Sequence, residues 1–217
     1  MTVDGDRAQL GDRVDPAIAV VEVDGVRLPL DPELTTWLLY KPPGVVTTMA
    51  DPQGRPTVMD LVPAEPATKP VGRLDMHSEG LLLMSNDGDL ALHVTHPRYG
   101  VTKTYQVLVP TTLNPGKLRP LLDGVDLDDG PARASSARIV STSKERTIVE
   151  LVLAEGRKRE VRRMFATQDI PIERLVRTAI GPITDRQLAP GAYRALALDE
   201  VRALYDAGTH EGDEPRG

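Results

Sequence analysis

The sequence contains no cysteine. This absence excludes disulfide bonds, thiolate catalysis and zinc sites built on cysteine. Aromatic residues make up only 3% of the chain, so a core has to be built from valine, leucine, isoleucine and alanine. No apolar run approaches the ~20 residues that a transmembrane helix requires, and the first residues lack the apolar segment of a signal peptide. We therefore expect a cytoplasmic protein.

A surplus of basic residues, which is typical of nucleic-acid-binding proteins, is also missing, because the net charge is −6. The acidic residues, however, concentrate at the two ends of the chain. Residues 37–198 contain 18 acidic and 21 basic residues, a net charge of +3. Within this stretch, residues 157–163 carry five positive charges. The charge distribution therefore permits an RNA partner without proving one.

The order of the predicted elements indicates an α+β fold and not a doubly wound sheet, because strands are interspersed irregularly with a few helices. The predicted strands are residues 36–40, 80–84, 103–109, 132–141, 147–154, 172–180 and 193–198. The predicted helices are a short one ending at residue 93, residues 114–124, residues 158–168 and a final one starting at residue 200. We expect short strands and a linker in residues 1–32, one main domain in residues 33–206 and a disordered tail in residues 207–217.

Asp75 is the first candidate for a catalytic residue. It lies between a loop rich in proline and glycine, residues 49–70, and the apolar run at residues 80–84. A carboxylate at such a junction can be desolvated and held rigidly, as a nucleophile or an acid–base catalyst requires. A lone aspartate before a strand is more often only a turn residue. Asp75 also alternates with His77 and Glu79, so a metal site of a phosphodiesterase is an alternative, although a solvated loop explains the pattern more simply.

The basic run at residues 157–163 is the second candidate feature. It overlaps a predicted helix whose apolar side includes Val161 and Phe165. Such a run is usually a solvated face. Arginines at the border of the apolar side can also pair with a buried carboxylate, while their neighbours bind phosphates. Lys103 and Tyr105 share one face of a predicted strand, where Tyr105 either packs in the core or stacks on a base.

Taken in order, five sequence blocks resemble the ribosomal-RNA pseudouridine synthases of the small-subunit and large-subunit type. The blocks are KPPGV at residues 41–45, GRLD with SEGLL within residues 72–82, KTY at residues 103–105, EGRKREVRRM at residues 155–164, and AIGP with LAPGAYR within residues 179–194. Together they span about residues 37–203. Each block is weakly specific, whereas the ordered set is a strong signal.

The resemblance implies a mixed, largely antiparallel sheet with flanking helices and a central catalytic cleft. It implies that Asp75 is the catalytic carboxylate, that Tyr105 packs against the target base and that Arg162 pairs with the aspartate. The residues expected to contact RNA are Arg73, Lys103, Arg157, Lys158, Arg159 and Arg163. The resemblance implies no metal and no organic cofactor. The expected partner is ribosomal RNA, which we expect to be that of the large subunit, and the expected state is a monomer.

The implied reaction fits the chemistry of these residues. Uracil must leave its N1 glycosidic bond, rotate and reattach through C5, and it has to come out of the RNA stack first. The sequence leaves open whether the carboxylate attacks the sugar or base covalently or removes a ribose proton. A non-catalytic RNA-binding protein on the same fold is an alternative of another class. The combination of Asp75, Tyr105 and Arg162 counts against it, because a binding protein needs no such set.

The N-terminus departs from the pattern of the resembled family. Relatives usually begin with a small RNA-binding module of two helices followed by short strands, and residues 2–28 resemble only the strand half. We expect a longer form of the protein to supply the helices. That form should bind RNA more tightly and with a steeper salt dependence.

Overall fold

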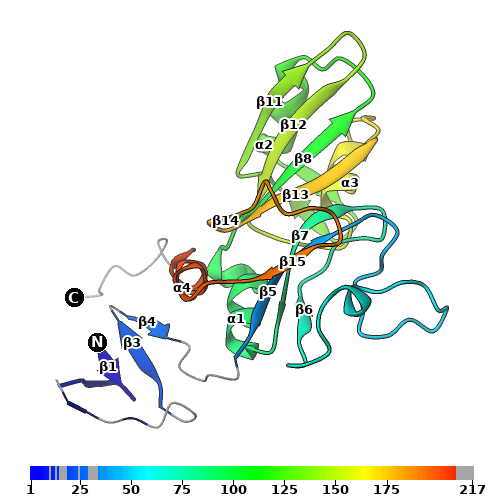
Figure 1. Cartoon of the computed structure of the whole chain (residues 1–217). Coiled ribbons are helices and arrows are strands. Elements are labelled where there is room, and N and C mark those ends of the chain that lie inside the picture. The colour runs from blue at the N-terminus through cyan, green and yellow to red at the C-terminus, as the bar shows by residue number, and fades with distance from the viewer. Residues whose placement is uncertain (10, 13, 15–18, 24, 29–33, 209–217) are drawn as a thin grey trace, which may run out of the picture.

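The computed structural model describes residues 1–208, except residues 10, 13, 15–18, 24 and 29–33. A nine-stranded sheet in the order β11-β12-β8-β13-β7-β5-β15 dominates it, with β14 attached to β13 and β6 to β7 (Figure 1). The pairing of β13 with β7 is parallel, and the other strand pairings of this sheet are antiparallel. The predicted α+β fold with a mixed, largely antiparallel sheet is therefore confirmed.

The strands of this sheet are β5 (Thr36–Lys41), β6 (Lys69–Val71), β7 (Glu79–Ser85), β8 (Lys103–Val109), β11 (Ser136–Thr142), β12 (Thr147–Leu153), β13 (Arg174–Ile180), β14 (Ile183–Thr184) and β15 (Tyr193–Ala195). The α-helices are α1 (Gly88–Thr95), α2 (Arg119–Asp123), α3 (Glu160–Ala166) and α4 (Leu198–Asp206). The 3-10 helices are η1 (Val58–Leu61), η2 (Pro97–Tyr99) and η3 (Pro115–Leu118). A separate hairpin of β9 (Val125–Leu127) and β10 (Gly130–Ala132) follows α2.

Every predicted strand and helix of the main domain is present, although the ends differ by a few residues. The predicted start of the third helix at residue 158 was wrong. The helix begins at Glu160, because Arg159 adopts a left-handed backbone conformation with φ 52° and ends the preceding loop. The sequence did not predict β6, β9, β10 and β14, which are only two or three residues long.

Alternation along the strands places one apolar cluster on each face of the sheet. On β7, Leu82 and Met84 belong to one cluster, and Leu81 and Leu83 belong to the other. Helices α1 and α4 contribute to the cluster of Leu81, whereas α2 and α3 contribute to the cluster of Leu82. The sheet is thus covered by helices on both faces.

The strands β7 and β13 approach each other closely at Gly80. Its φ is 108°, and a Cβ atom on this residue would lie 2.2 Å from the carbonyl oxygen of Arg177. Only glycine fits such a position. The close approach brings Arg177, from the C-terminal part of the chain, next to the residues that follow Asp75.

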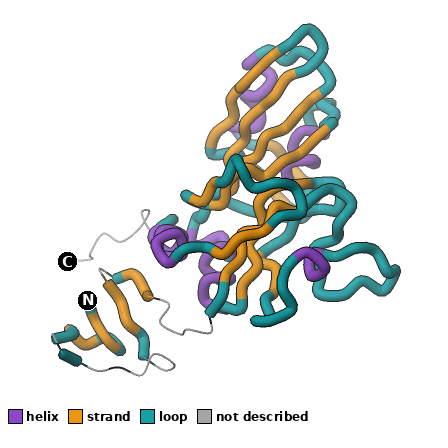
Figure 2. Tube along the Cα trace, in the orientation of Figure 1, coloured by secondary structure: helices purple, strands orange, loops and turns teal. Residues whose placement is uncertain are grey.

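The segment between β5 and β6 is mostly loop, as Figure 2 shows, with η1 as its only helix among the described residues. This agrees with the long surface loop predicted at residues 49–70. The loop is nevertheless anchored, because Val58 in η1 is fully buried in the core.

The N-terminal residues form a second, four-stranded sheet in the order β2-β1-β3-β4. Its strands are β1 (Thr2–Val3), β2 (Asp6–Arg7), β3 (Val21–Val23) and β4 (Val26–Leu28), and β4 lies beside α4 (Figure 1). Short strands in this region were predicted. The predicted linker at residues 29–32 and all but the first two residues of the predicted tail at 207–217 lie outside the described residues. No helix in the described part of the chain has the length and hydropathy to span a membrane.

Candidate active site

A cavity of about 340 Å³ opens where β8, β12 and β13 meet two loops of the chain. It is lined by residues 71–75 and 78, by residues 94 and 95 at the end of α1, by residues 156–161, and by Lys103, Tyr105, Leu153, Leu175, Arg177 and Ile180 of the sheet. The candidate residues Asp75 and Tyr105 therefore line one cavity, although 30 positions separate them. Arg73, Lys103, Arg157, Lys158 and Arg159 line it as well.

Asp75 lies in a loop whose backbone carbonyls are hydrogen-bonded by a buried lysine. The side chain of Lys41 is completely buried, and its Nζ donates to the carbonyl oxygens of Ser78 at 2.7 Å, Pro42 at 2.9 Å and Met76 at 3.4 Å. Burial lowers the pKa of Lys41 to about 8, although the nearby carboxylate of Asp75 opposes the shift. The ammonium ion thus fixes the backbone directly after Asp75.

The backbone directly before Asp75 is fixed in the same way. The Thr47 hydroxyl donates to the carbonyl oxygen of Leu74 at 2.8 Å. The Arg177 guanidinium is 5% exposed and donates from Nε to the Leu81 carbonyl at 2.7 Å and from Nη1 to the Arg73 carbonyl at 3.5 Å. Such bonds hold a loop in one conformation, which a catalytic group needs. No role was predicted for Lys41, Thr47 or Arg177.

Two arginines of the basic run reach the Asp75 loop. Nη2 of Arg162 donates to the His77 carbonyl at 3.2 Å and to the Ser78 hydroxyl at 3.4 Å. The pKa of Arg162 is lowered, mainly by burial and also by the neighbouring Arg159, although the Asp75 carboxylate opposes the shift. The ion pair of the Asp75 carboxylate is with Arg159, at 3.9 Å between Oδ2 and Nη1. Arg162 therefore contacts the backbone that carries Asp75, and its direct pairing with the carboxylate stays a prediction.

The strand β8 contributes Tyr105 and Lys103, which are 7% and 8% exposed. Tyr105 packs into the apolar core and presents part of its side chain to the cavity. Lys103 donates from Nζ to the carbonyls of Val94 and Val101, both at 2.7 Å. Burial lowers the pKa of Lys103 to about 8. This burial arises because Lys103 shares the inward face of β8 with Tyr105. Lys103 also lines the cavity, and its expected contact with RNA stays a prediction.

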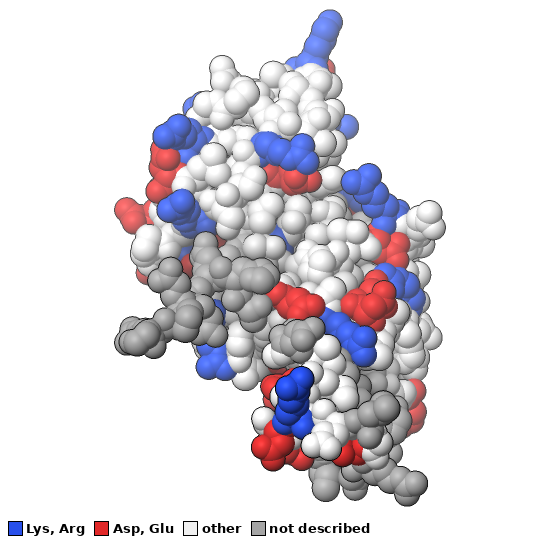
Figure 3. Space-filling view, turned by 90° about the vertical axis from the view of Figure 1, so that its left-hand side faces the viewer, with Lys and Arg blue, Asp and Glu red and all other residues white. Residues whose placement is uncertain are grey.

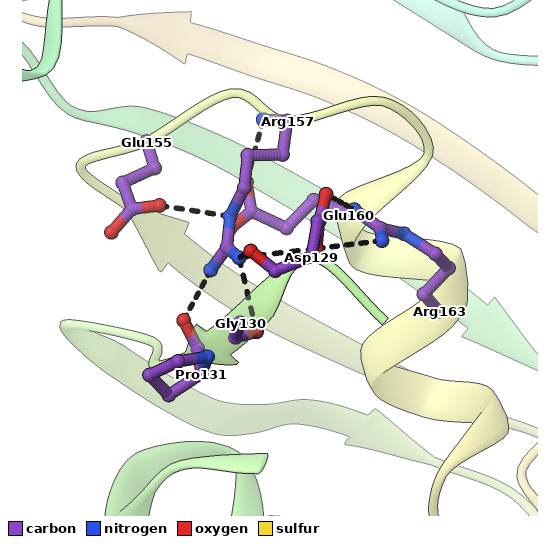
Figure 4. Close-up of polar contacts among 7 residues, drawn as sticks. All are labelled: Asp129, Gly130, Pro131, Glu155, Arg157, Glu160 and Arg163. Carbon is purple, nitrogen blue, oxygen red and sulfur yellow. Dashed lines mark hydrogen bonds and ion pairs between the residues drawn. The ribbon is translucent and has the colours of Figure 1, made fainter. Parts of the chain in front are cut away.

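Two other arginines expected to bind RNA are engaged within the protein (Figure 4). Arg163 forms a bidentate pair with Asp129, with both distances at 2.8 Å, and Arg157 contacts the same carboxylate at 3.2 Å. These bonds raise the pKa of Arg163 and lower that of Asp129. Among the described residues, Arg73 and Lys158 are exposed cavity-lining cations whose side chains form no bond or ion pair.

The face drawn in Figure 3 carries charges of both signs. Across its coloured residues, lysines and arginines are mixed with aspartates and glutamates, without a continuous basic patch.

The geometry does not support the metal-site alternative. The Glu79 carboxylate is bound by Nη2 of Arg174 at 3.0 Å and by the Tyr40 hydroxyl at 3.2 Å, and the arginine lowers the pKa of Glu79. His77 is exposed, whereas Glu79 is buried. Within the part of the chain that the structure describes, no three histidine, aspartate or glutamate side chains converge on a site for a metal ion.

Comparisons with known proteins identify the family of the chain. The family model described as RNA pseudouridylate synthase matches residues 35–167. An uncharacterized RNA pseudouridine synthase of Mycobacterium leprae is 44% identical over 201 residues, which cover 91% of this chain and 78% of that protein. The ribosomal large subunit pseudouridine synthase B of Vibrio vulnificus is 38% identical, with coverage of 95% and 67%. A solved structure described as pseudouridylate synthase superposes with a TM-score of 0.71 at 26% identity and covers 94% of this chain and 87% of that one.

The family match spans more than half of the chain and includes the loop of Asp75, the strand of Tyr105 and the basic helix. The alternative of a non-catalytic RNA-binding protein is therefore set aside. The chain belongs to the RNA pseudouridylate synthase family and is an RNA pseudouridine synthase, an isomerase.

Proposed function

We propose that this protein converts a specific uridine of large-subunit ribosomal RNA into pseudouridine, with Asp75 as the catalytic carboxylate. The observation that carries the proposal is the cavity in which Asp75 and Tyr105 meet, beside a loop whose carbonyls are bound by buried cations. Support for the substrate comes from relatives in Vibrio vulnificus, Pasteurella multocida and Shigella flexneri, which carry the name ribosomal large subunit pseudouridine synthase B at 36–38% identity.

The cavity suits a single extruded base. Its volume of about 340 Å³ is at the lower end of the range for ligand pockets. Extruding a base costs a few kcal/mol, and stacking on an aromatic ring such as that of Tyr105 returns about 1–3 kcal/mol. The Asp75 side chain is 28% exposed, so it is accessible to a nucleotide that enters the cavity.

The reaction moves one bond and one proton. The bond between the sugar C1′ and the base N1 breaks, the uracil turns and a bond forms between C1′ and C5. C5 then loses its proton and N1 gains one, so that the product is an isomer of uridine. Asp75 assists the cleavage step, and Arg159 and Arg162 supply positive charge beside it. Arg73 and Lys158 are accessible at the cavity and suited to the phosphates that flank the flipped nucleotide. Access to ribosomal RNA implies a cytoplasmic location.

The test is a map of pseudouridines in ribosomal RNA from cells with and without the gene. Deletion should remove one or a few pseudouridines from large-subunit RNA, and the wild-type gene should restore them. An Asp75→Asn gene expressed at the same level should not. An unchanged large-subunit map, or losses confined to small-subunit RNA, would overturn the proposed substrate.

A further inference from the structure

A hairpin distant in sequence fastens the loop that leads into α3. The tip of the β9–β10 hairpin carries Asp129, and the loop at residues 155–159 carries Arg157 (Figure 4). Arg163, on α3, grips Asp129 with both terminal nitrogens at 2.8 Å. The hairpin, the loop and the helix are therefore joined at one carboxylate.

All three guanidinium nitrogens of Arg157 donate hydrogen bonds within the protein. Nη1 donates to the Gly130 carbonyl at 3.1 Å and to the Asp129 carboxylate at 3.2 Å, and Nη2 donates to the Pro131 carbonyl. Nε contacts Glu160 at 3.2 Å, whose other oxygen accepts from the Arg157 backbone N–H at 3.0 Å. The planar guanidinium of Arg157 thus donates hydrogen bonds from all three of its nitrogens. These bonds fix the position of the loop, and the carboxylates neutralise the charge of the arginine.

The fastened segment forms one wall of the cavity, residues 156–161. Within it, Arg159 has the left-handed φ of 52° that non-glycine residues rarely adopt. Such a conformation persists only where the surroundings hold it. It directs the guanidinium of Arg159 to within 3.9 Å of the Asp75 carboxylate.

We propose that Asp129 and Arg157 are positioning residues, which hold Arg159 opposite Asp75 by binding the β9–β10 hairpin to the loop at residues 155–159. We call the ion pairs of Asp129, Glu155 and Glu160 with Arg157 and Arg163 the clasp. The inference rests on the proposed role of Asp75. The charges of the clasp support a positioning role over phosphate binding. Two arginines face the three carboxylates of Asp129, Glu155 and Glu160, so the clasp presents no excess positive charge to RNA.

The primary test measures tritium release from C5 of uridine in a labelled large-subunit ribosomal RNA transcript, with the full chain. Asp129→Asn should lower kcat on the order of tenfold, as expected for a displaced catalytic contact, and leave KM within about twofold. Asp126→Asn is the matched control. It makes the same charge change at an exposed residue of the same hairpin, which has no side-chain hydrogen bond or ion pair among the described residues, and should match the wild type.

A double-mutant cycle tests whether Asp129 acts through Arg159. In an Arg159→Ala background, Asp129→Asn should cause no further loss of kcat. Losses that multiply would overturn the proposal, because they would show that the clasp acts elsewhere. A lower KM with unchanged kcat in Asp129→Asn would also overturn it, since the released arginines would then be phosphate ligands.

Two controls keep the outcomes separable. Arg157→Lys retains the charge and loses the donor fork, so it should reproduce the fall in kcat and carries the test if Asp129→Asn is unfolded at the assay temperature. A wild-type chain inactive on the transcript would refute the proposed substrate. An active wild type with an equally active Asp129→Asn variant would refute only the clasp.

Discussion

A Lys41→Met variant would remove a buried ammonium ion from beneath the loop that carries Asp75. The wild-type side chain is completely buried and donates to three carbonyl oxygens. Hydrogen bonds from charged groups stabilise a fold by about 1.5–3 kcal/mol each. Loss of these bonds is partly offset, because methionine carries no charge that burial would penalise. We expect the free energy of unfolding to fall by about 1–3 kcal/mol at pH 7.

The same substitution should have a larger effect at alkaline pH. Lys41 has a pKa of about 8 in the fold, against 10.5 for an unperturbed lysine. Between these values the unfolded chain binds more protons than the folded chain, so this lysine makes the wild type more stable as pH rises. Methionine cannot titrate. The difference in unfolding free energy between the wild type and Lys41→Met should therefore widen by about 2 kcal/mol from pH 7 to pH 9.5.

Urea unfolding of both proteins at the two pH values measures this difference. Lys69→Met is the control, because Lys69 is exposed and its replacement should give a difference that does not change with pH. A Lys41→Met difference that is equal at both pH values would show that burial does not lower the pKa of Lys41, since the buried lysine would then titrate like an exposed one.

Other substitutions test the aromatic residue of the cavity, an exposed lysine beside it and the close approach of two strands of the sheet. Tyr105→Leu keeps apolar bulk in the core but removes the ring, so kcat/KM in the tritium-release assay should fall by roughly 5- to 150-fold, whereas an unchanged value would argue against base stacking. Lys158→Ala should reduce the slope of log affinity for RNA against log salt by ~1 in anisotropy titrations, and an unaltered slope would exclude a phosphate contact. Gly80→Ala places a Cβ atom 2.2 Å from the Arg177 carbonyl, so urea unfolding should show a loss of about 1–3 kcal/mol or more, and a near-neutral result would contradict the close approach of β7 and β13.

Local sequence patterns predicted the strands well, and β8 shows why. Its buried residues Tyr105, Val107 and Val109 recur with the period of two that a strand requires. The same period places Lys103 on the inward face with Tyr105. The strand pattern does not identify the carbonyls of Val94 and Val101, which accept hydrogen bonds from the buried ammonium.

The basic run shows the limit of sequence reasoning at the site. The sequence located five positive charges between residues 157 and 163 but not their partners. Asp129, which binds Arg157 and Arg163, lies 28 and 34 positions away on a hairpin whose two short strands were not predicted. Without the position of the hairpin, the sequence could not show which arginines of the basic run have partners within the protein.

The family blocks located Asp75 but not the reason for its rigidity. Lys41 and Arg177 come from strands on either side of β7 in the sheet, and only the strand order brings both to the same loop. The period of two along β13 places Arg177 on the face of Leu175 and Ala179, but it does not identify the carbonyl oxygens that Arg177 binds. Those partners emerge from the tertiary structure alone.

The catalytic role of Asp75 is tested most directly by the activity of purified Asp75→Asn on large-subunit ribosomal RNA. Asparagine preserves the shape of the side chain, and the carboxylate is 28% exposed with one ion pair at 3.9 Å, so the fold should be retained. We expect wild-type RNA affinity in an anisotropy titration and no detectable pseudouridine after prolonged incubation. Pseudouridine formation at a rate within tenfold of the wild type would contradict the catalytic role of Asp75.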